Sequence, residues 1–280
     1  DGGWRFMLDD ASGIAYVRLT EFLPNAPAQL DDAMRTALNN GARALILDLR
    51  ENRGGLLDAA IDVADRFLAG GVIVSTRGLH GPSSDPREWR ARGEGAYPNI
   101  SMAVLVNAWS ASSAEIVAGA LRDHRRAVLV GERTYGKGSV QELIPLRNDC
   151  AVKLTTRHYY LPGGACIQKP RHADADHPDW GVMPNVVVPL TPGQRERWLK
   201  QWLDATWNHI EPSSTQEVET EEQVAAFLEA LLDADPQFKR AVELLRTRTD
   251  QDGANISNGN EPPPENAQPV ESDPGRVTSP

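Results

Sequence analysis

The sequence predicts an α/β fold in which a mixed β-sheet packs against amphipathic helices. Three observations support this fold class. Short aliphatic runs, too short for buried helices, recur along the chain and indicate buried strands. Between them lie segments whose apolar residues repeat at helical spacing. Glycine-rich turns follow several of the strands, so these turns are expected to face one edge of the sheet.

The composition is that of a globular chain without a membrane span. At 280 residues and 40% hydrophobic content, it can bury one substantial core and a small second unit. The net charge of -10 argues against nucleic acid or an anionic membrane as a partner. No apolar run approaches the roughly 18 residues of a spanning helix. The chain begins with Asp1 rather than Met, so a signal peptide or anchor would lie outside it.

The first half of the chain is predicted to alternate strands and helices. The expected elements are a strand at 14–19, a helix at 28–40, a buried strand at 44–49, a helix over 56–67 and a strand at 72–77. A polar, glycine-rich loop then extends to residue 98 and is expected to border a cleft.

The second half continues this pattern and then changes in composition. It predicts strands at 103–107, 127–130, 139–145, 152–160 and 181–188, with a helix after residue 112. We expect a core over 1–192, a helical C-terminal extension over 193–247 that Asp235-Pro236 interrupts, and a disordered tail over 248–280. Cys150 and Cys166 flank an expected hairpin, and a disulfide between them is possible but not implied.

A serine at the start of the predicted helix after residue 112 is the first candidate for chemistry. Ser112 lies where a strand leads into a helix N-terminus, beside unpaired backbone N–H groups that suit a developing oxyanion. This position favours a nucleophile. Ser112 and Glu115 also match the S-x-x-E capping box, in which Ser112 is simply the N-cap. Both interpretations remain open on the sequence alone.

A serine nucleophile needs a base, and Lys137 is the better of two candidates. His124 lies beyond the far end of the helix, about 15 Å or more away at roughly 1.5 Å per residue. Because a lysine ordinarily has a pKa of about 10.4, the hypothesis requires burial that lowers this pKa by several units. The alternative is an exposed turn lysine. The loop 131–138 also nearly matches a phosphate-binding motif, but Gly138 replaces the required hydroxyl and a strand follows.

Two further segments invite a functional interpretation. The turn at Gly54-Gly55 follows a buried strand, and it is either plain turn chemistry or a place where a backbone N–H reaches a substrate carbonyl. The segment 172–177, His-Ala-Asp-Ala-Asp-His, fits no metal-ligand spacing, so a solvated loop is favoured.

Together these motifs resemble the carboxy-terminal processing peptidases, the tail-specific proteases of serine peptidase family S41. The family signature runs approximately N-G-G-S-A-S-A-S-E-I and is followed by G-K-G-x-V-Q, which residues 107–116 and 136–141 match. The D-L-R-x-N-x-G-G block is matched at 48–55. Ala108-Trp109 stands where two glycines are usual, and Trp109 narrows the approach to the proposed site. The resemblance covers roughly residues 8–190.

The resemblance implies a crotonase-like or ClpP-like core and a serine endopeptidase with a Ser–Lys dyad. It implies Ser112 as nucleophile, Lys137 as base, Gln141 as the residue that orients the lysine, and Glu115 as a supporting acid. Amides of Gly54 or Gly55 and of Ser113 would form the oxyanion hole. No metal or organic cofactor is implied.

The implied substrate is a protein or peptide, cleaved near its C-terminus in an extracytoplasmic compartment such as the periplasm. In the family a PDZ domain lies upstream, and we expect none within these 280 residues, so that the chain is either a fragment or recruits its substrate differently. Two alternatives remain open: an acyl-CoA enzyme of the crotonase fold, and a catalytically idle peptide-binding scaffold. The natural substrate and oligomeric state do not follow from the sequence.

Overall fold

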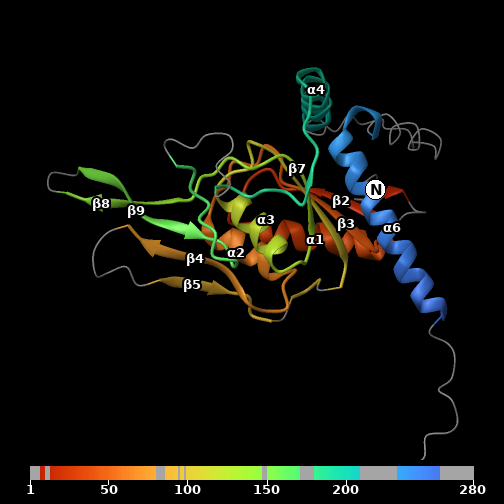
Figure 1. The fold of residues 1–280 in the computed structure, drawn as a ribbon, viewed down its shortest axis with the longest axis horizontal. Coiled ribbons are helices and arrows are strands. Elements are labelled where there is room, and N and C mark those ends of the chain that lie inside the picture. Colours follow the sequence, from red (N-terminus) through yellow and green to blue (C-terminus); the bar gives the residue numbers. More distant parts are fainter. Residues whose placement is uncertain are drawn as a thin grey trace, which may run out of the picture.

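The fold is built around a six-stranded sheet with helices on both faces (Figure 1). This computed structural model describes residues 7–9, 13–79, 86–93, 95–97, 99–146, 150–170, 180–208 and 232–258. None of the helices in these ranges is long and apolar enough to cross a membrane. The segment 172–177 lies outside the described residues.

The central sheet is parallel except at one edge. Its strand order is β1-β2-β3-β6-β7-β10, and β1 alone runs antiparallel to its neighbour. The bounds are Met7–Asp9 for β1, Ile14–Arg18 for β2, Ala44–Asp48 for β3, Ser101–Val106 for β6, Val128–Gly131 for β7 and Val186–Val187 for β10. Because β3, β6 and β7 are parallel, the loops that follow them meet at one edge of the sheet.

Side chains of the central strands alternate between two apolar clusters. Leu45 and Leu47 of β3 face one cluster, and Ala44 and Ile46 face the other. The first cluster is covered by α1 (Ala26–Asn39), α2 (Leu57–Asp65) and α3 (Ser113–Asp123). The second is covered by α6 (Pro236–Asn258) through Phe238, Ala241, Val242 and Leu245. Since both faces are buried, these strands are apolar throughout.

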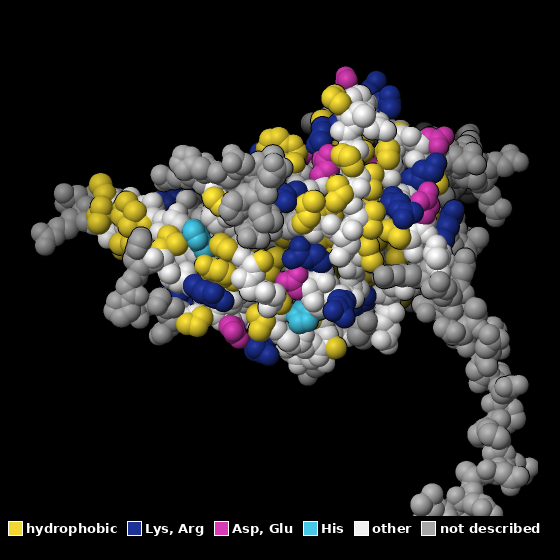
Figure 2. Space-filling model, viewed as in Figure 1, with side chains coloured by type: hydrophobic (Ala, Val, Ile, Leu, Met, Phe, Trp, Pro, Cys, Tyr) yellow, Lys and Arg dark blue, Asp and Glu magenta, His cyan; other side chains and the backbone are white. Residues whose placement is uncertain are grey.

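A second, antiparallel sheet extends away from the core. Its order is β5-β4-β9-β8, with bounds Arg87–Arg90, Val72–Gly78, Ala151–Tyr160 and Ser139–Pro145. The β8–β9 hairpin forms an arm that carries yellow apolar side chains in Figure 2. Leu143 of β8 is 71% exposed. The strand β5 lies where the sequence predicted only loop. Its charged residues lack an apolar alternation, and pairing with β4 determines its conformation.

The C-terminal part contains two described helices, α4 (Pro192–Asn208) and α6. The interruption at Asp235 is confirmed, because α6 begins at Pro236. The sequence predicted disorder from residue 248, whereas α6 continues to Asn258. The first turns of α6 pack on the sheet as far as Leu245, its last buried leucine. Because each further residue adds a hydrogen bond to a helix that has already formed, the helix can continue beyond that point. Residues 209–231 and 259–280 lie outside the described residues.

A buried arginine connects α6 to the end of β3. Arg50 is 2% exposed, and its guanidinium lies 2.7 Å from Asp48 Oδ2 and 2.7 Å from Asp235 Oδ2. The ring of Trp198 from α4 lies 4.5 Å from the same guanidinium. Burial acts to raise the pKa of Asp48, but Arg50 and then Arg18 outweigh it and hold this pKa below its ordinary value. The cluster therefore attaches the C-terminal helices to the strand that leads into Gly54-Gly55.

We expect Asp235→Asn to lower the free energy of unfolding by about 3 kcal/mol, since it leaves the buried charge of Arg50 partly uncompensated. Asp235 Oδ1 also accepts the N–H groups of Gln237 and Phe238 at the start of α6. Asp235→Ala removes this cap as well and should cost about 1 kcal/mol more. Urea unfolding measures both variants.

The matched control is Lys239→Ala, which breaks an exposed pair with Asp233 at 3.8 Å and should change stability little. Equal effects of Asp235→Asn and Lys239→Ala would show that the buried pair does not stabilise α6.

Candidate active site

Ser112 occupies a backbone conformation that few non-glycine residues adopt. It is the N-cap of α3, with φ 56° and ψ −115°. Within the described residues, only Glu51 and Arg125 among the other non-glycine residues have positive φ. Such strain persists where the surroundings enforce it, and it is commonest at functional sites. The half-buried Ser112 thus lies at a sharp turn between β6 and α3.

Hydrogen bonds join the loop before Ser112 to the loop after β3. Ser110 Oγ donates to the Leu49 carbonyl at 2.8 Å, and the Ala111 amide donates to the Asn52 carbonyl at 2.9 Å. Ser113 Oγ donates to the Gly55 carbonyl at 3.0 Å. The serine loop and the Gly54-Gly55 turn are therefore held as one unit at the carboxyl edge of the sheet.

The buried carboxylate of Glu115 joins the serine to the lysine loop. Its Oε2 accepts the Ser112 amide and the Lys137 amide, each at 2.8 Å. Its Oε1 accepts the Thr134 hydroxyl at 2.5 Å and the Gly136 amide at 2.7 Å. Burial raises the pKa of Glu115, although these hydrogen bonds act to lower it. The capping arrangement predicted from S-x-x-E is present, and the same carboxylate holds Lys137 beside Ser112.

Lys137 and Gln141 are less enclosed than the sequence hypothesis requires. The sequence hypothesis expected a buried Lys137, and this expectation is wrong: Lys137 is exposed, and no described residue covers it. Its backbone is fixed by Glu115, but the flanking Gly136 and Gly138, rather than the lysine side chain, are the buried residues of the loop. Gln141 is exposed on β8 and makes no hydrogen bond to Lys137 among the described residues. Its predicted role in orienting the lysine remains a prediction.

Gly54 and Gly55 differ in their surroundings. Gly54 has φ 102°, and a Cβ there would lie 2.8 Å from Ser112 Cβ. Its N–H already donates to Asn52 Oδ1 at 2.8 Å. Gly55 is exposed, and neither its N–H nor that of Ser113 has a hydrogen-bond partner among the described residues. Gly54 thus permits close approach of the serine turn, while Gly55 offers a free amide.

Three supporting residues were not identified from the sequence. Thr134 donates to Glu115, Asn52 anchors Gly54, and Asn107 accepts the amide of Trp109 at 3.1 Å. Asn107 also donates to Glu51 Oε1 at 2.9 Å. Asn107 directly follows β6 and Asn52 lies in the loop after β3, and polar residues in loops at the carboxyl ends of strands are the signal that would have identified them. Thr134 carries no such signal, because its partner is distant in sequence.

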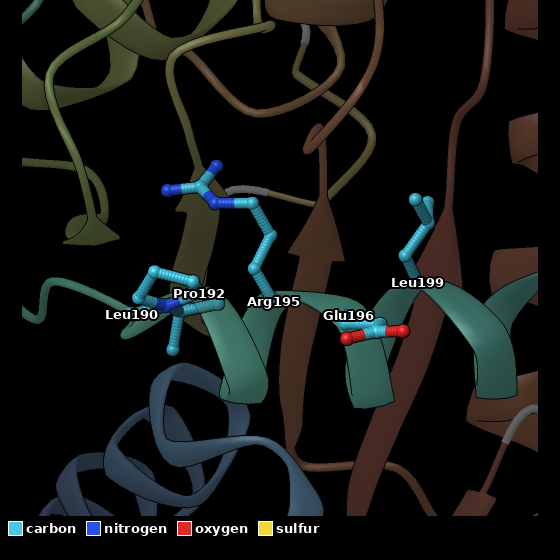
Figure 3. Close-up of a pocket in the computed structure, with 5 residues that line it drawn as sticks. All are labelled: Leu190, Pro192, Arg195, Glu196 and Leu199. Atoms are coloured by element: carbon cyan, nitrogen blue, oxygen red, sulfur yellow. The ribbon is translucent and has the colours of Figure 1, made fainter.

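Other candidate groups lie away from Ser112. His124 is at the far end of α3, as predicted, with Nε2 at 2.7 Å from the Val72 carbonyl oxygen. Cys150 and Cys166 are free thiols. A hollow beside α4 is lined by Leu190, Pro192, Arg195, Glu196 and Leu199 (Figure 3). None of these lining residues is a candidate site residue, so this hollow is not part of the site. The guanidinium of Arg195 pairs with Glu132 at 2.9 Å.

Residues 13–188, which include this whole arrangement, match the model of peptidase family S41. The chain belongs to this family. It is 36% identical over 237 residues to a carboxy-terminal-processing protease of Bartonella bacilliformis, covering 83% of this chain and 52% of that protein. It is 39% identical over 184 residues to a carboxyl-terminal-processing protease of Synechocystis, covering 65% of this chain and 40% of that protein. The chain spans about half the length of such relatives.

Solved structures agree with the family assignment. A photosystem II D1 C-terminal processing protease matches with a TM-score of 0.56 and 33% identity, over 63% of this chain and 42% of that one. Mature CPAF in complex with lactacystin matches with a TM-score of 0.53 and 15% identity, over 70% of this chain and 51% of that one. This match shows similarity of fold alone. The mixed α/β core is therefore an S41 peptidase fold.

We expect Glu115→Gln to disrupt this site. Both carboxylate oxygens accept two donors, so an amide NH₂ placed on either side leaves two buried donors unsatisfied. Each costs about 1–3 kcal/mol. The variant should be destabilised in urea and, if the site is catalytic, lose at least a hundredfold in kcat/KM. The control is Glu132→Gln, which alters a partly exposed pair with Arg195 and a hydrogen bond from the Leu190 amide, both away from Ser112. Unchanged stability of Glu115→Gln would contradict the role of the carboxylate.

Gly54→Ala tests the close approach to Ser112. The new Cβ combines a strained φ of 102° with a contact of 2.8 Å to Ser112 Cβ. Gly164→Ala is the matched control, since Gly164 has φ 85° and open space around its Cβ position. Strain should lower the free energy of unfolding of both variants by about 1 kcal/mol. Only Gly54→Ala should also lower the rate of peptide cleavage. Equal behaviour of both would mean that the contact is unimportant.

Proposed function

We propose that this chain is the catalytic part of a serine endopeptidase with Ser112 as nucleophile and Lys137 as general base. The observation that carries the proposal is that one buried carboxylate, Glu115, accepts the backbone N–H groups of both residues. The strained φ of Ser112 supports it, because few non-glycine residues adopt such a conformation without a functional reason. Membership of family S41 supports it independently.

In the proposed mechanism, the Lys137 amine removes the hydroxyl proton of Ser112 while Oγ bonds to the peptide carbonyl carbon. The resulting oxyanion is bound by the free amides of Gly55 and Ser113, with Gly54 leaving room for the serine turn. The C–N bond then breaks, and the leaving amine takes the proton from Lys137. Water hydrolyses the acyl-enzyme, with Lys137 accepting its proton and Ser112 regaining one. Gln141 would orient the lysine.

The exposed position of Lys137 implies a role for the substrate in this mechanism. A protonated amine has no lone pair and cannot accept a proton, and removal of water from around any amine favours its neutral form. A peptide lying across Ser112 would exclude water from Lys137 at the moment when a base is needed. The substrate thereby completes an environment that the described residues leave open.

The finer features follow from family membership, as part of the same proposal. We infer cleavage near the C-termini of protein substrates, an extracytoplasmic location, and a crotonase-like or ClpP-like architecture for residues 1–192. A second candidate function, a peptide-binding scaffold without catalysis, is favoured by one observation, the exposure of Lys137.

The decisive test is cleavage of unfolded casein by the full chain. Ser112→Ala and Lys137→Ala should each reduce cleavage at least a thousandfold, because each removes one partner of a single proton transfer. Lys200→Ala, which alters an exposed lysine on α4, is the control and should cleave normally. Cleavage retained by both dyad variants would rule out this mechanism, and casein binding without cleavage by the unmodified chain would favour the scaffold.

A further inference from the structure

Three exposed side chains form a stacked group beside the candidate site. The rings of Trp109 and Tyr135 stack with centroids 6.5 Å apart and an interplanar angle of 24°. The guanidinium of Arg53 lies 4.8 Å from the centre of the Trp109 ring. We call Arg53, Trp109 and Tyr135 the aromatic shelf.

Each member of the aromatic shelf is carried by one of the three loops that build the site. Arg53 directly precedes Gly54, Trp109 lies in the loop that leads into Ser112, and Tyr135 is two residues before Lys137. The Tyr135 amide donates to the Ser110 carbonyl at 3.0 Å, so the lysine loop lies directly against the serine loop. The shelf therefore borders the place where a scissile peptide would meet Ser112.

The shelf presents apolar surface that the described residues do not cover. Trp109 is 41% exposed and Tyr135 is 50% exposed. Burying such a ring against a ligand is favourable by about 25 cal/mol per Å² of apolar surface, and aromatic rings contribute disproportionately to binding energy. The Trp109 side chain stands where the related signature has a glycine, so this surface is a feature of this chain.

Arg53 adds a cation to the apolar surface. Its guanidinium face lies over Trp109, which leaves the N–H groups at its edge available. No acidic side chain among the described residues pairs with the exposed Arg53. A guanidinium with free N–H groups beside apolar rings is suited to bind a carboxylate next to an apolar group.

We propose that the aromatic shelf is a substrate subsite, which takes a large apolar side chain next to the scissile bond together with a nearby carboxylate. The apolar side chain packs on Trp109 and Tyr135, and the carboxylate binds Arg53. The carboxylate is either an Asp or Glu side chain of the substrate or the free C-terminus of a short remaining segment. This subsite rests on the proposed function, since it places the scissile bond at Ser112.

Binding is measured first on the full chain carrying Ser112→Ala, so that the result does not depend on cleavage. Peptides with Leu or Phe near an acidic residue should bind at least tenfold more tightly than matched peptides with Ala. Trp109→Ala and Tyr135→Ala, each added to Ser112→Ala, should remove this preference while leaving the binding of the Ala peptides unchanged. Leu143→Ala, on the β8–β9 arm, is the control and should have no effect.

The role of Arg53 is tested with peptides that differ only in charge. Changing Asp to Asn in the peptide, or amidating its C-terminus, identifies the carboxylate that matters, and Arg53→Gln should abolish that difference. A uniform loss of affinity for all peptides in the shelf variants, or none for any, would overturn the subsite. If the unmodified chain cleaves nothing yet shows these preferences, the peptidase proposal fails, and the aromatic shelf stands as a peptide-binding surface only. If the chain with Ser112 intact shows the same peptide preferences in kcat/KM, and the shelf variants lose them, both the peptidase proposal and the subsite are supported.

Discussion

The whole site depends on a single buried carboxylate. Glu115 would be costly to bury as an anion, and four donors to its two oxygens offset that cost. Two of these donors come from the turn at Gly136-Lys137, and one is the amide of Ser112. The same group therefore caps α3 and holds the lysine loop, so the start of the helix and the lysine loop share one anchor. The geometry is therefore set by backbone amides, which tolerate changes in the surrounding side chains.

The parallel sheet supplies the second constraint. It brings the ends of β3, β6 and β7 to one edge, so that three loops distant in sequence become neighbours. Each loop carries one of the candidate groups: the free amide of a glycine, the strained serine, or the lysine. The loops also hydrogen-bond to one another, as the contacts of Ser110 and Ala111 show. A rigid sheet thus positions a group of loops that are themselves linked by hydrogen bonds.

Much of this arrangement could be predicted from sequence. The strands and helices of the core follow from apolar periodicity, and the capping box of Ser112 and Glu115 is present as the sequence predicted. The functional interpretation of the same two residues stays a prediction. Local patterns could not predict β5, whose conformation comes from pairing with β4. Nor could they predict the exposure of Lys137, because exposure depends on which distant segments cover a loop. The Arg50–Asp235 pair joins residues far apart in the chain, and sequence spacing carries no information about it.

The Arg50–Asp235 pair also has a consequence for the order of events during synthesis. A chain leaves the ribosome from its N-terminus, and its domains fold as units. The family-matched residues 13–188 emerge before α6, which covers one face of β3, β6 and β7 and neutralises Arg50 at the strand leading to Gly54-Gly55. Until α6 emerges, that face of the sheet is open and the arginine lacks one of its carboxylates. The newborn polypeptide would thus complete the support beneath the candidate site late, after residues 54–141, which hold all of the proposed site residues, have been translated.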